Sequence, residues 1–289
     1  MGFRLCGRVF LAASLGWIAS VAWAQSAAPA VNLDKAFKAS GNWYASWGYS
    51  RQQYAPSDIH VSQPSLGNNY TLHSVKAGDF PGTFSQTLES LGRLDWTSPQ
   101  ENVRIGRFLT PEKDFAIEFS LDHSKYNTNI GQTVRMTGTK NGAAVNTDVV
   151  LTSNTFTYNL HNGLNHIMVN GVWFKDLYGP KNQPGHLQFL SRAGVGVLLP
   201  HAENILDGNA NSVGPKQVNV CCGKGDWWQL NGWTVGVELG FRYTFYRSMY
   251  LELTTKQAYG ALRGVPVYEG TAKQKIWMME EVLSTGFVF

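Results

Sequence analysis

Three consecutive residues, Asp122, His123 and Ser124, carry the side chains of nucleophilic acyl chemistry, and His161 and His166 follow after a loop. A serine nucleophile needs a histidine as general base and an acid that orients this histidine, all within hydrogen-bond reach. The set therefore suggests an ester hydrolase as one alternative. In a regular strand, however, neighbouring residues point to opposite faces, so His123 and Ser124 could not be partners there.

A second set of ionisable residues occurs at alternate positions within apolar segments. Its acids are Glu118, Asp122, Glu238, Glu252 and Glu280, and its bases are Arg104, Arg192, Arg242 and Lys256. If these side chains share one interior, they must pair, because an unpaired buried charge costs several kcal/mol. The near balance of acids and bases predicts a network of ion pairs.

The elements that would position both sets show a period of two. Between residues 233 and 245 every second residue is apolar: Trp233, Val235, Val237, Leu239, Phe241, Tyr243 and Phe245. A strand with this pattern has one apolar and one polar face. Similar alternation predicts strands over 43–54, 102–109, 115–126, 164–174, 187–200, 231–246, 249–260 and 274–289. Almost no segment has a helical period with caps, so we predict an all-β chain.

The length of these segments favours a membrane barrel over a soluble sheet. Several run to ten residues or more, whereas strands average about 5–6 residues in soluble proteins and need about 9–11 to cross a membrane obliquely. We therefore expect a transmembrane antiparallel up-and-down β-barrel over 43–289. A soluble periplasmic β-sandwich that binds a ligand is the alternative.

The connections alternate between short and long, as they do in outer-membrane barrels. The long ones, expected as external loops, are 127–163, 201–230 and 261–273. With both chain ends on the periplasmic side, the number of strands must be even. Segments 59–62 and 70–77 favour ten strands if they cross the membrane as a hairpin, and the count is eight if they belong to a loop.

The N-terminal segment has the features of an export signal. Residues 1–24 combine Arg4 and Arg8 with an apolar run and end in Ala22-Trp23-Ala24. This pattern predicts a cleaved secretory signal peptide, with a membrane anchor as the alternative. Residues 25–42 are then a periplasmic lead-in.

The composition restricts the partners. Only 15% of the 289 residues are charged, and the net charge of +4 falls to +2 without Arg4 and Arg8, which gives no reason to expect nucleic acid. Cys221 and Cys222 are adjacent, so in an oxidising compartment they could form a strained disulfide or an intermolecular bridge. His60 and His73 are expected as solvated or hydrogen-bonded residues; we expect no metal site and no cofactor.

The C-terminal stretch Ser284-Thr285-Gly286-Phe287-Val288-Phe289 alternates and ends on an aromatic residue. Together with the export signal, it resembles the Gram-negative outer-membrane β-barrel superfamily. The resemblance implies location in the outer membrane and recognition of Phe287 and Phe289 by the barrel-assembly machinery. It also implies contact with outer-membrane lipid and lipopolysaccharide. The segment around 48–79 is similar to a family of exported barrel proteins that implies no activity of its own.

The same resemblance fixes what the interior is expected to hold. Outer-membrane strands are apolar outside and polar inside, so the charged set should line the lumen of a monomeric barrel. In a narrow barrel this set predicts a salt-bridged plug with a structural role, or else a porin-like passage for small solutes. The hydrolase alternative would act on lipid A or phospholipid. The aromatic residues Tyr44, Trp173, Tyr246 and Tyr250 are expected in belts at the membrane interfaces.

Overall fold

The computed structural model describes residues 41–79, 100–212 and 228–289. The expected signal peptide, nearly all of the lead-in, Cys221 and Cys222 lie outside these ranges. Within them the fold is almost entirely antiparallel β-structure. No helix among the described residues has the length and apolar character needed to cross a membrane.

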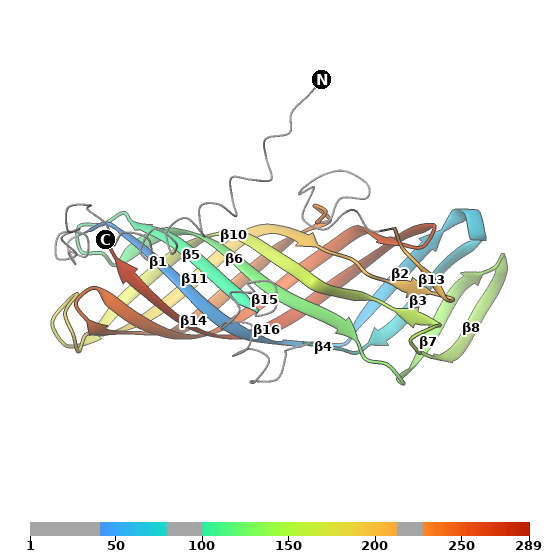
Figure 1. The fold of residues 1–289 in the computed structure, drawn as a ribbon, viewed down its shortest axis with the longest axis horizontal. Coiled ribbons are helices and arrows are strands. Elements are labelled where there is room, and N and C mark those ends of the chain that lie inside the picture. The colour runs from blue at the N-terminus through green and yellow to red at the C-terminus, as the bar shows by residue number, and fades with distance from the viewer. Residues whose placement is uncertain (1–40, 80–99, 213–227) are drawn as a thin grey trace, which may run out of the picture.

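Within the described ranges, eight strands form a closed ring (Figure 1). In order around it, they are β1 (Trp43–Tyr54), β5 (Glu101–Phe108), β6 (Phe115–Thr128), β10 (Asn159–Tyr178), β11 (Leu187–Pro200), β14 (Gly232–Tyr246), β15 (Met249–Val267) and β16 (Gly270–Val288). The ring closes where β16 pairs with β1 from Tyr44↔Val288 to Tyr54↔Met278. The fold is thus the expected up-and-down barrel, with the smaller of the two strand numbers that the sequence allowed.

The strand register sets the width of the barrel. A path that starts at Tyr44 and steps to the paired residue on each successive strand passes Gly106, Glu118 and Asn170. It continues around the ring and returns to β1 at Tyr54, ten residues further along. Eight tilted strands enclose an interior just wide enough for side chains to fill. The register therefore predicts a packed interior rather than a wide pore.

The remaining longer strands extend the sheet beyond one end of the ring. Their order outward from β16 is β2 (Ser57–Gln63), β3 (Asn68–Val75), β7 (Thr133–Lys140) and β8 (Ala143–Val150). In Figure 1 this sheet lies at the end opposite the C-terminus. The hairpin that favoured ten strands is β2–β3, and it pairs with the outer end of β16 through Ile59↔Gln274 instead of joining the ring. Short pieces complete the fold: η1 (Pro64–Leu66), β4 (Ala77–Gly78), β9 (Phe156–Thr157), β12 (Ile205–Leu206) and β13 (Asn209–Ala210).

Two of the expected loops are largely strand. Range 261–273 was expected as a loop, but β15 and β16 run through it and leave only residues 268–269 as the turn. Range 127–163 contains the β7–β8 hairpin. Both ranges lack the strict apolar alternation of the membrane strands, and for this reason the sequence predicted loops there. β15 and β16 continue past the membrane and β7–β8 lies beyond the ring, and strands in either place need no apolar outer face.

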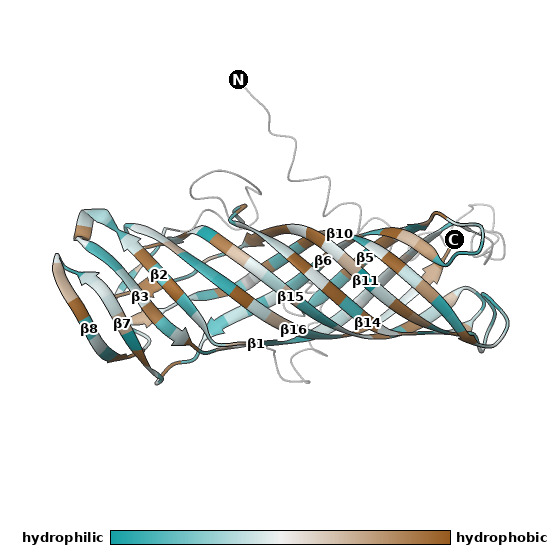
Figure 2. Ribbon diagram, turned by 180° about the vertical axis from the view of Figure 1, so that it is seen from behind, coloured by the Kyte–Doolittle hydropathy of each residue, from teal (hydrophilic) through white to brown (hydrophobic). Residues whose placement is uncertain are grey.

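The outer surface of the ring is apolar. Val237 is 56% exposed, Leu253 60% and Leu283 59%, while the alternate positions on the same strands are buried. Figure 2 shows the resulting alternation of hydrophobic and hydrophilic positions along the strands. A soluble sheet would bury the apolar face, so the observed direction is that of a barrel surrounded by lipid.

Three layers fill the interior. Near the C-terminal end lies a small apolar cluster that includes Tyr44, Phe108, Phe174 and Tyr250. At the other end, under β2, β3 and β7, lies a larger apolar cluster: Ile59, Leu72, Tyr126, Met136, Leu160, Leu198, Leu262 and Ile276 are among its members. The charged residues lie between these two clusters. Along the barrel, one polar layer thus lies between two apolar layers.

Candidate functional site: the charged layer of the barrel

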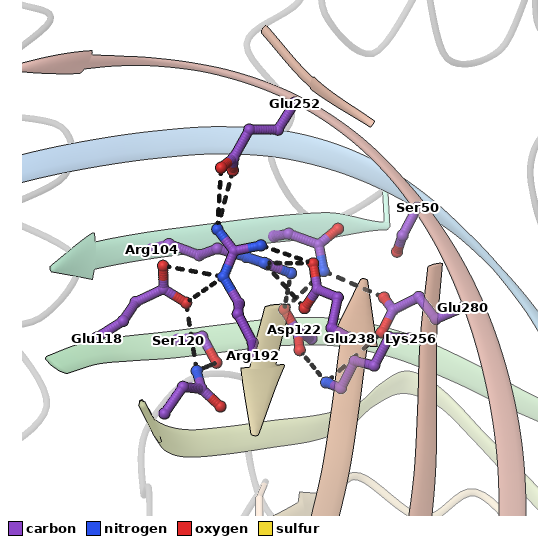
Figure 3. Close-up of polar contacts among 12 residues, drawn as sticks. Ser50, Arg104, Glu118, Ser120, Asp122, Arg192, Glu238, Glu252, Lys256 and Glu280 are labelled. Atoms are coloured by element: carbon purple, nitrogen blue, oxygen red, sulfur yellow. Dashed lines mark hydrogen bonds and ion pairs between the residues drawn. The ribbon is translucent and has the colours of Figure 1, made fainter. Parts of the chain in front are cut away.

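The charged layer consists of the nine residues of the predicted ionisable set. None is more than 4% exposed: Arg104, Glu118, Asp122, Arg192, Glu238, Arg242, Glu252, Lys256 and Glu280. They come from β5, β6, β11, β14, β15 and β16, each at a position that the alternation turns inward. The structure brings all nine together in the interior, and Figure 3 shows most of them converging from different strands.

Arg192 is the centre of the layer. Its Nε lies 3.1 Å from Glu118 Oε1, its Nη1 lies 2.9 Å from Glu238 Oε1, and its Nη2 lies 3.0 Å from Glu252 Oε2. A guanidinium group presents five donors in a fixed plane, so one arginine can hold three carboxylates from three strands. Arg192 therefore ties β6, β14 and β15 together across the lumen.

A second group of contacts joins the layer to the other side of the barrel. Arg104 Nη1 donates to Glu238 Oε1 at 2.9 Å, and its Nη2 lies 3.6 Å from Asp122 Oδ1. Lys256 forms an ion pair with Asp122 and lies 3.7 Å from Glu280 Oε2. Because Glu238 and Asp122 each contact two bases, the pairs form one continuous network.

Neutral side chains donate hydrogen bonds to one oxygen of Glu280. Its Oε1 accepts hydrogen bonds from Gln52 Nε2 at 2.9 Å and from Asn102 Nδ2 at 3.1 Å. Gln52 and Asn102 are themselves buried, with 3% and 1% exposed. The other oxygen, Oε2, accepts no hydrogen bond from the described residues and lies 3.7 Å from the Lys256 ammonium group, whose charge compensates it. Gln52 extends the layer to β1, and Asn102 adds a second contact from β5.

Arg242 closes the layer at the end near the C-terminus. Its Nε donates to Glu252 Oε1 at 2.9 Å, and its guanidinium carbon lies 3.8 Å from the ring centroid of Tyr250, 4.5 Å from Phe174 and 4.7 Å from Tyr44. A cation is attracted to the face of an aromatic ring within about 6 Å of its centroid. The three rings therefore hold Arg242 at the boundary between the charged layer and the smaller apolar cluster.

The aromatic members of this boundary correct a sequence-based expectation. Tyr44 and Tyr250 were expected at membrane interfaces, but they are 0% and 1% exposed inside the barrel. Trp173 and Tyr246 do lie outside, with 49% and 52% exposed. The inward position of Tyr44 also adds a contact that sequence reasoning missed, because its hydroxyl donates to Glu118 Oε2 at 2.8 Å.

Glycine provides the signal that could have found these rings. Tyr44 is paired with Gly106 across β1 and β5, and Tyr250 is paired with Gly286 across β15 and β16. A Cβ at Gly106 would lie 2.2 Å from Tyr44 Cζ, and one at Gly286 would lie 2.5 Å from the Tyr250 ring. Each of these two tyrosines thus lies over a glycine on the next strand. A tyrosine opposite a glycine at a lumen position predicts a ring folded across the strand pair.

The residues of the suggested hydrolase do not form a catalytic arrangement. Ser124 is fully buried, and its hydroxyl donates to Leu164 O at 2.7 Å. His123 points to the opposite face of β6 and contacts Asn165 Oδ1 at 2.7 Å. Asp122 is held by Lys256 in the charged layer. The strand is regular here, so alternation places His123 on the face opposite to that of Asp122 and Ser124.

The two other histidines of that set also lie apart. His166 is buried and its Nδ1 lies 3.1 Å from Thr234 Oγ1. His161 Nε2 lies 2.8 Å from Glu203 Oε2 at the outer end of β10. Both histidines thus contact residues other than Ser124. In the described part of the chain, neither is placed to act as a base on Ser124.

The histidines on the external sheet are hydrogen-bonded. His60 Nδ1 lies 3.0 Å from Thr71 Oγ1, and His73 Nδ1 lies 3.1 Å from Asp58 Oδ2. In the described part of the chain, no group of three or more His, Cys, Asp or Glu side chains is arranged to hold a metal ion. What these histidines do in the structure is join β2 to β3.

Comparison with known proteins gives likeness in architecture only. No family model matches the sequence, and none of the curated proteins matches it. Among solved structures, the chain is similar to Neisserial surface protein A, with 9% identity over 86% of this chain and 97% of that one and a TM-score of 0.38. It is also similar to the outer membrane protein AlkL, with 14% identity, coverage of 92% and 95% and a TM-score of 0.38. The outer membrane protein OprG from Pseudomonas aeruginosa shows 10% identity, coverage of 86% and 98% and a TM-score of 0.37.

The class of protein follows from the chain's own geometry. The ring closes on itself, seven of its eight strands have 12 residues or more, which is enough to cross a bilayer, and its exposed face is apolar around a polar interior. Closure leaves no unpaired strand edge in the ring, as a lipid environment requires. These features define a transmembrane β-barrel.

Proposed function

We propose that this chain is an outer-membrane protein with a structural role, whose barrel is closed to solutes by its own side chains. The observation that carries the proposal is the buried charged layer centred on Arg192, which contacts Glu118, Glu238 and Glu252 across the lumen. A passage for ions would need hydrated, separated charges at this level. Here the carboxylates are in direct contact with the bases.

The apolar layers on both sides of the network support the same proposal. Tyr44, Phe174 and Tyr250 pack around Arg242 at one end. At the other end, Tyr126 and Leu164 belong to an apolar cluster and are at most 1% exposed. A solute would have to displace two apolar layers and break the ion pairs between them.

Outer-membrane location is part of the proposal. It is supported by the apolar outer face and by the long β-structure on the side of the barrel opposite the C-terminus. Phe289 pairs with Trp43 through two backbone hydrogen bonds, from Trp43 N to Phe289 O and from Phe289 N to Trp43 O. Recognition of Phe287 and Phe289 by the barrel-assembly machinery, and a monomeric state, remain predictions.

Planar-bilayer recordings test the closed interior. The refolded protein should give no discrete conductance steps, while an open porin in the same bilayers gives them. Heat-modifiable migration on a gel checks that the inserted protein is folded. Reproducible steps from folded protein would contradict a closed barrel and favour the narrow passage.

A further inference from the structure

The lipid-facing surface of the barrel has an open groove of about 560 Å³. It crosses the outer faces of β10, β11, β14, β15 and β16, and its lining residues include Ala193, Val195, Val237, Tyr259 and Trp277. Nearly all of the lining residues are apolar. The groove lies outside the lumen and has no part in the charged layer.

Short side chains form the floor of the groove and aromatic residues form its wall. On the outer face Ala193 is the cross-strand partner of Val237 and Val195 is the partner of Val235, so two adjacent strands carry only small apolar side chains at this level. Tyr259 and Trp277 stand beside it with ring centroids 5.0 Å apart, and Trp233 lies 5.6 Å from Tyr259. Rings of this kind gather where a bilayer meets water. The groove therefore runs along the hydrocarbon layer and ends at the interface.

Basic side chains continue the same surface beyond these rings. Lys275 and Lys273 follow Trp277 on the outward face of β16, two and four residues further from the groove, and both are exposed. With about 3.3 Å of rise per residue, they lie roughly 7 and 13 Å further along the strand. This is the side of the barrel that carries the external sheet.

A β-bulge adds a third base at this level. The register of β15 and β16 passes from Leu262↔Gln274 to Val265↔Ala272, so Arg263 and Gly264 together face Lys273. Gly264 has φ = +71°, a left-handed conformation that glycine adopts without strain. The bulge leaves Arg263 exposed beside Lys273.

The surroundings leave this cluster positive. Asp58, the acid on the neighbouring part of β2, is already engaged by Ser74 N at 2.8 Å and by His73 Nδ1 at 3.1 Å. His60 is the cross-strand partner of Lys273, and its pKa is lowered by burial and, second, by the charge of Lys273. The cluster of Arg263, Lys273 and Lys275 therefore presents its charge to the outside.

We propose that the groove and this basic cluster form one site for a phosphorylated, multiply acylated glycolipid of the outer leaflet. An acyl chain lies in the groove against Tyr259 and Trp277, and a phosphate at the lipid headgroup accepts hydrogen bonds from Arg263, Lys273 and Lys275. Charge-assisted contacts of this kind are the strong ones for phosphate. The inference rests on the outer-membrane location proposed above, since only there does the lipid reach this face.

The test is a lipid titration of the folded full-length protein in detergent, followed by native mass spectrometry. The probes are bisphosphorylated lipid A, the same lipid A after phosphatase treatment, and phosphatidylglycerol. Wild-type protein should bind one bisphosphorylated lipid A about tenfold more tightly than either other lipid, as expected when several bases contribute near a charged headgroup.

Two pairs of variants locate the site. Arg263→Gln/Lys273→Gln/Lys275→Gln should remove the preference for the phosphorylated lipid, whereas Arg107→Gln/Lys175→Gln/Lys181→Gln, three exposed bases at the opposite end, should keep it. Val195→Phe fills the groove and should lower the affinity for all three lipids by about tenfold. Val103→Phe makes the same change on the lipid face of β5, where it should have no effect.

Equal binding of all three lipids by wild-type protein, or an unchanged preference in the first triple variant, would overturn the site. A groove variant that binds as wild-type would overturn the placement of the acyl chain. Failure of the proposed location gives a different result. A protein that stays in solution without detergent and does not associate with bilayers would not be a membrane barrel.

Discussion

The two faces of β14 show opposite uses of charge. Glu238 and Arg242 point inward and are 4% and 2% exposed, within reach of Arg192, Glu252 and three aromatic rings. Between and beside them, Val237 and Leu239 point outward and are 56% and 50% exposed. The polar side of this strand is its packed side, so charge provides the interior contacts that apolar side chains provide in a soluble protein.

The outer face is not uniformly apolar. Arg51 and Glu281 are cross-strand partners at exposed positions, and Thr255 Oγ1 donates to Glu281 Oε1 at 2.9 Å. Both charges lie on the lipid side of the ring, next to opposite charge. The two faces therefore differ in how many charged side chains contact one another. The interior holds a connected network, and the exterior holds isolated polar contacts.

The largest effect should come from removing the centre of the inner network. Arg192→Leu leaves Glu118, Glu238 and Glu252 without their shared partner, and an uncompensated buried charge costs about 3–5 kcal/mol. We expect the free energy of unfolding in lipid vesicles to fall by about this amount. Ser191→Leu, on the outer face of the same strand, is the control and should leave stability nearly unchanged.

A charge placed on the outer face should have a somewhat smaller effect. Val237→Arg puts a guanidinium into the hydrocarbon region, which costs about 2–4 kcal/mol near the middle of a bilayer. The measurement is the same unfolding titration, together with the yield of protease-protected barrel. Wild-type stability and normal insertion of Val237→Arg would contradict the assignment of this face to lipid.

A third change tests how tightly the interior is packed. Gly106→Val would place a Cβ 2.2 Å from Tyr44 Cζ and displace the ring from Glu118 and Arg242. Overpacking of this kind costs about 1–3 kcal/mol. Gly78→Ala, where the nearest atom to a Cβ is 3.4 Å away, should be tolerated. Equal stability of the two variants would mean that Tyr44 does not occupy the lumen as described.

The smallest effect is expected at Ser124. Ser124→Ala removes one hydrogen bond to Leu164 O, worth about 0.5–1.5 kcal/mol. The variant also tests the hydrolase alternative, because mass analysis of lipid A from cells that make either protein should give the same profile. A change in the profile that requires Ser124 would restore the enzyme hypothesis.

Sequence predicted the strands well where one face must meet lipid. The alternation placed strands at 187–200 and 43–54, which are the bounds of β11 and β1. It failed past the membrane, where β15 and β16 continue through 261–273 without an apolar outer face. Strand number was ambiguous for the opposite reason: the β2–β3 hairpin does alternate like a membrane strand, but its apolar residues pack on an apolar cluster.

The charged layer could be predicted as a set but not as a network. Inward direction follows from the period of two, so Arg192 and Glu238 were expected in the lumen. Which charges meet depends on the ten-residue stagger of the ring, and no local pattern contains that number. The cage of Tyr44, Phe174 and Tyr250 around Arg242 was missed because tyrosine at a strand end suggests an interface until its glycine partner is known.

The central claim, an interior held by direct contact between Arg192 and three carboxylates, can be measured in a bilayer. Solid-state NMR of the labelled protein in lipid should show through-space correlations from the Arg192 guanidinium nitrogens to the carboxyl carbons of Glu118, Glu238 and Glu252. All three correlations are predicted at temperatures where the barrel is folded. A guanidinium that shows none of them and exchanges its protons rapidly with water would mean a hydrated, open lumen.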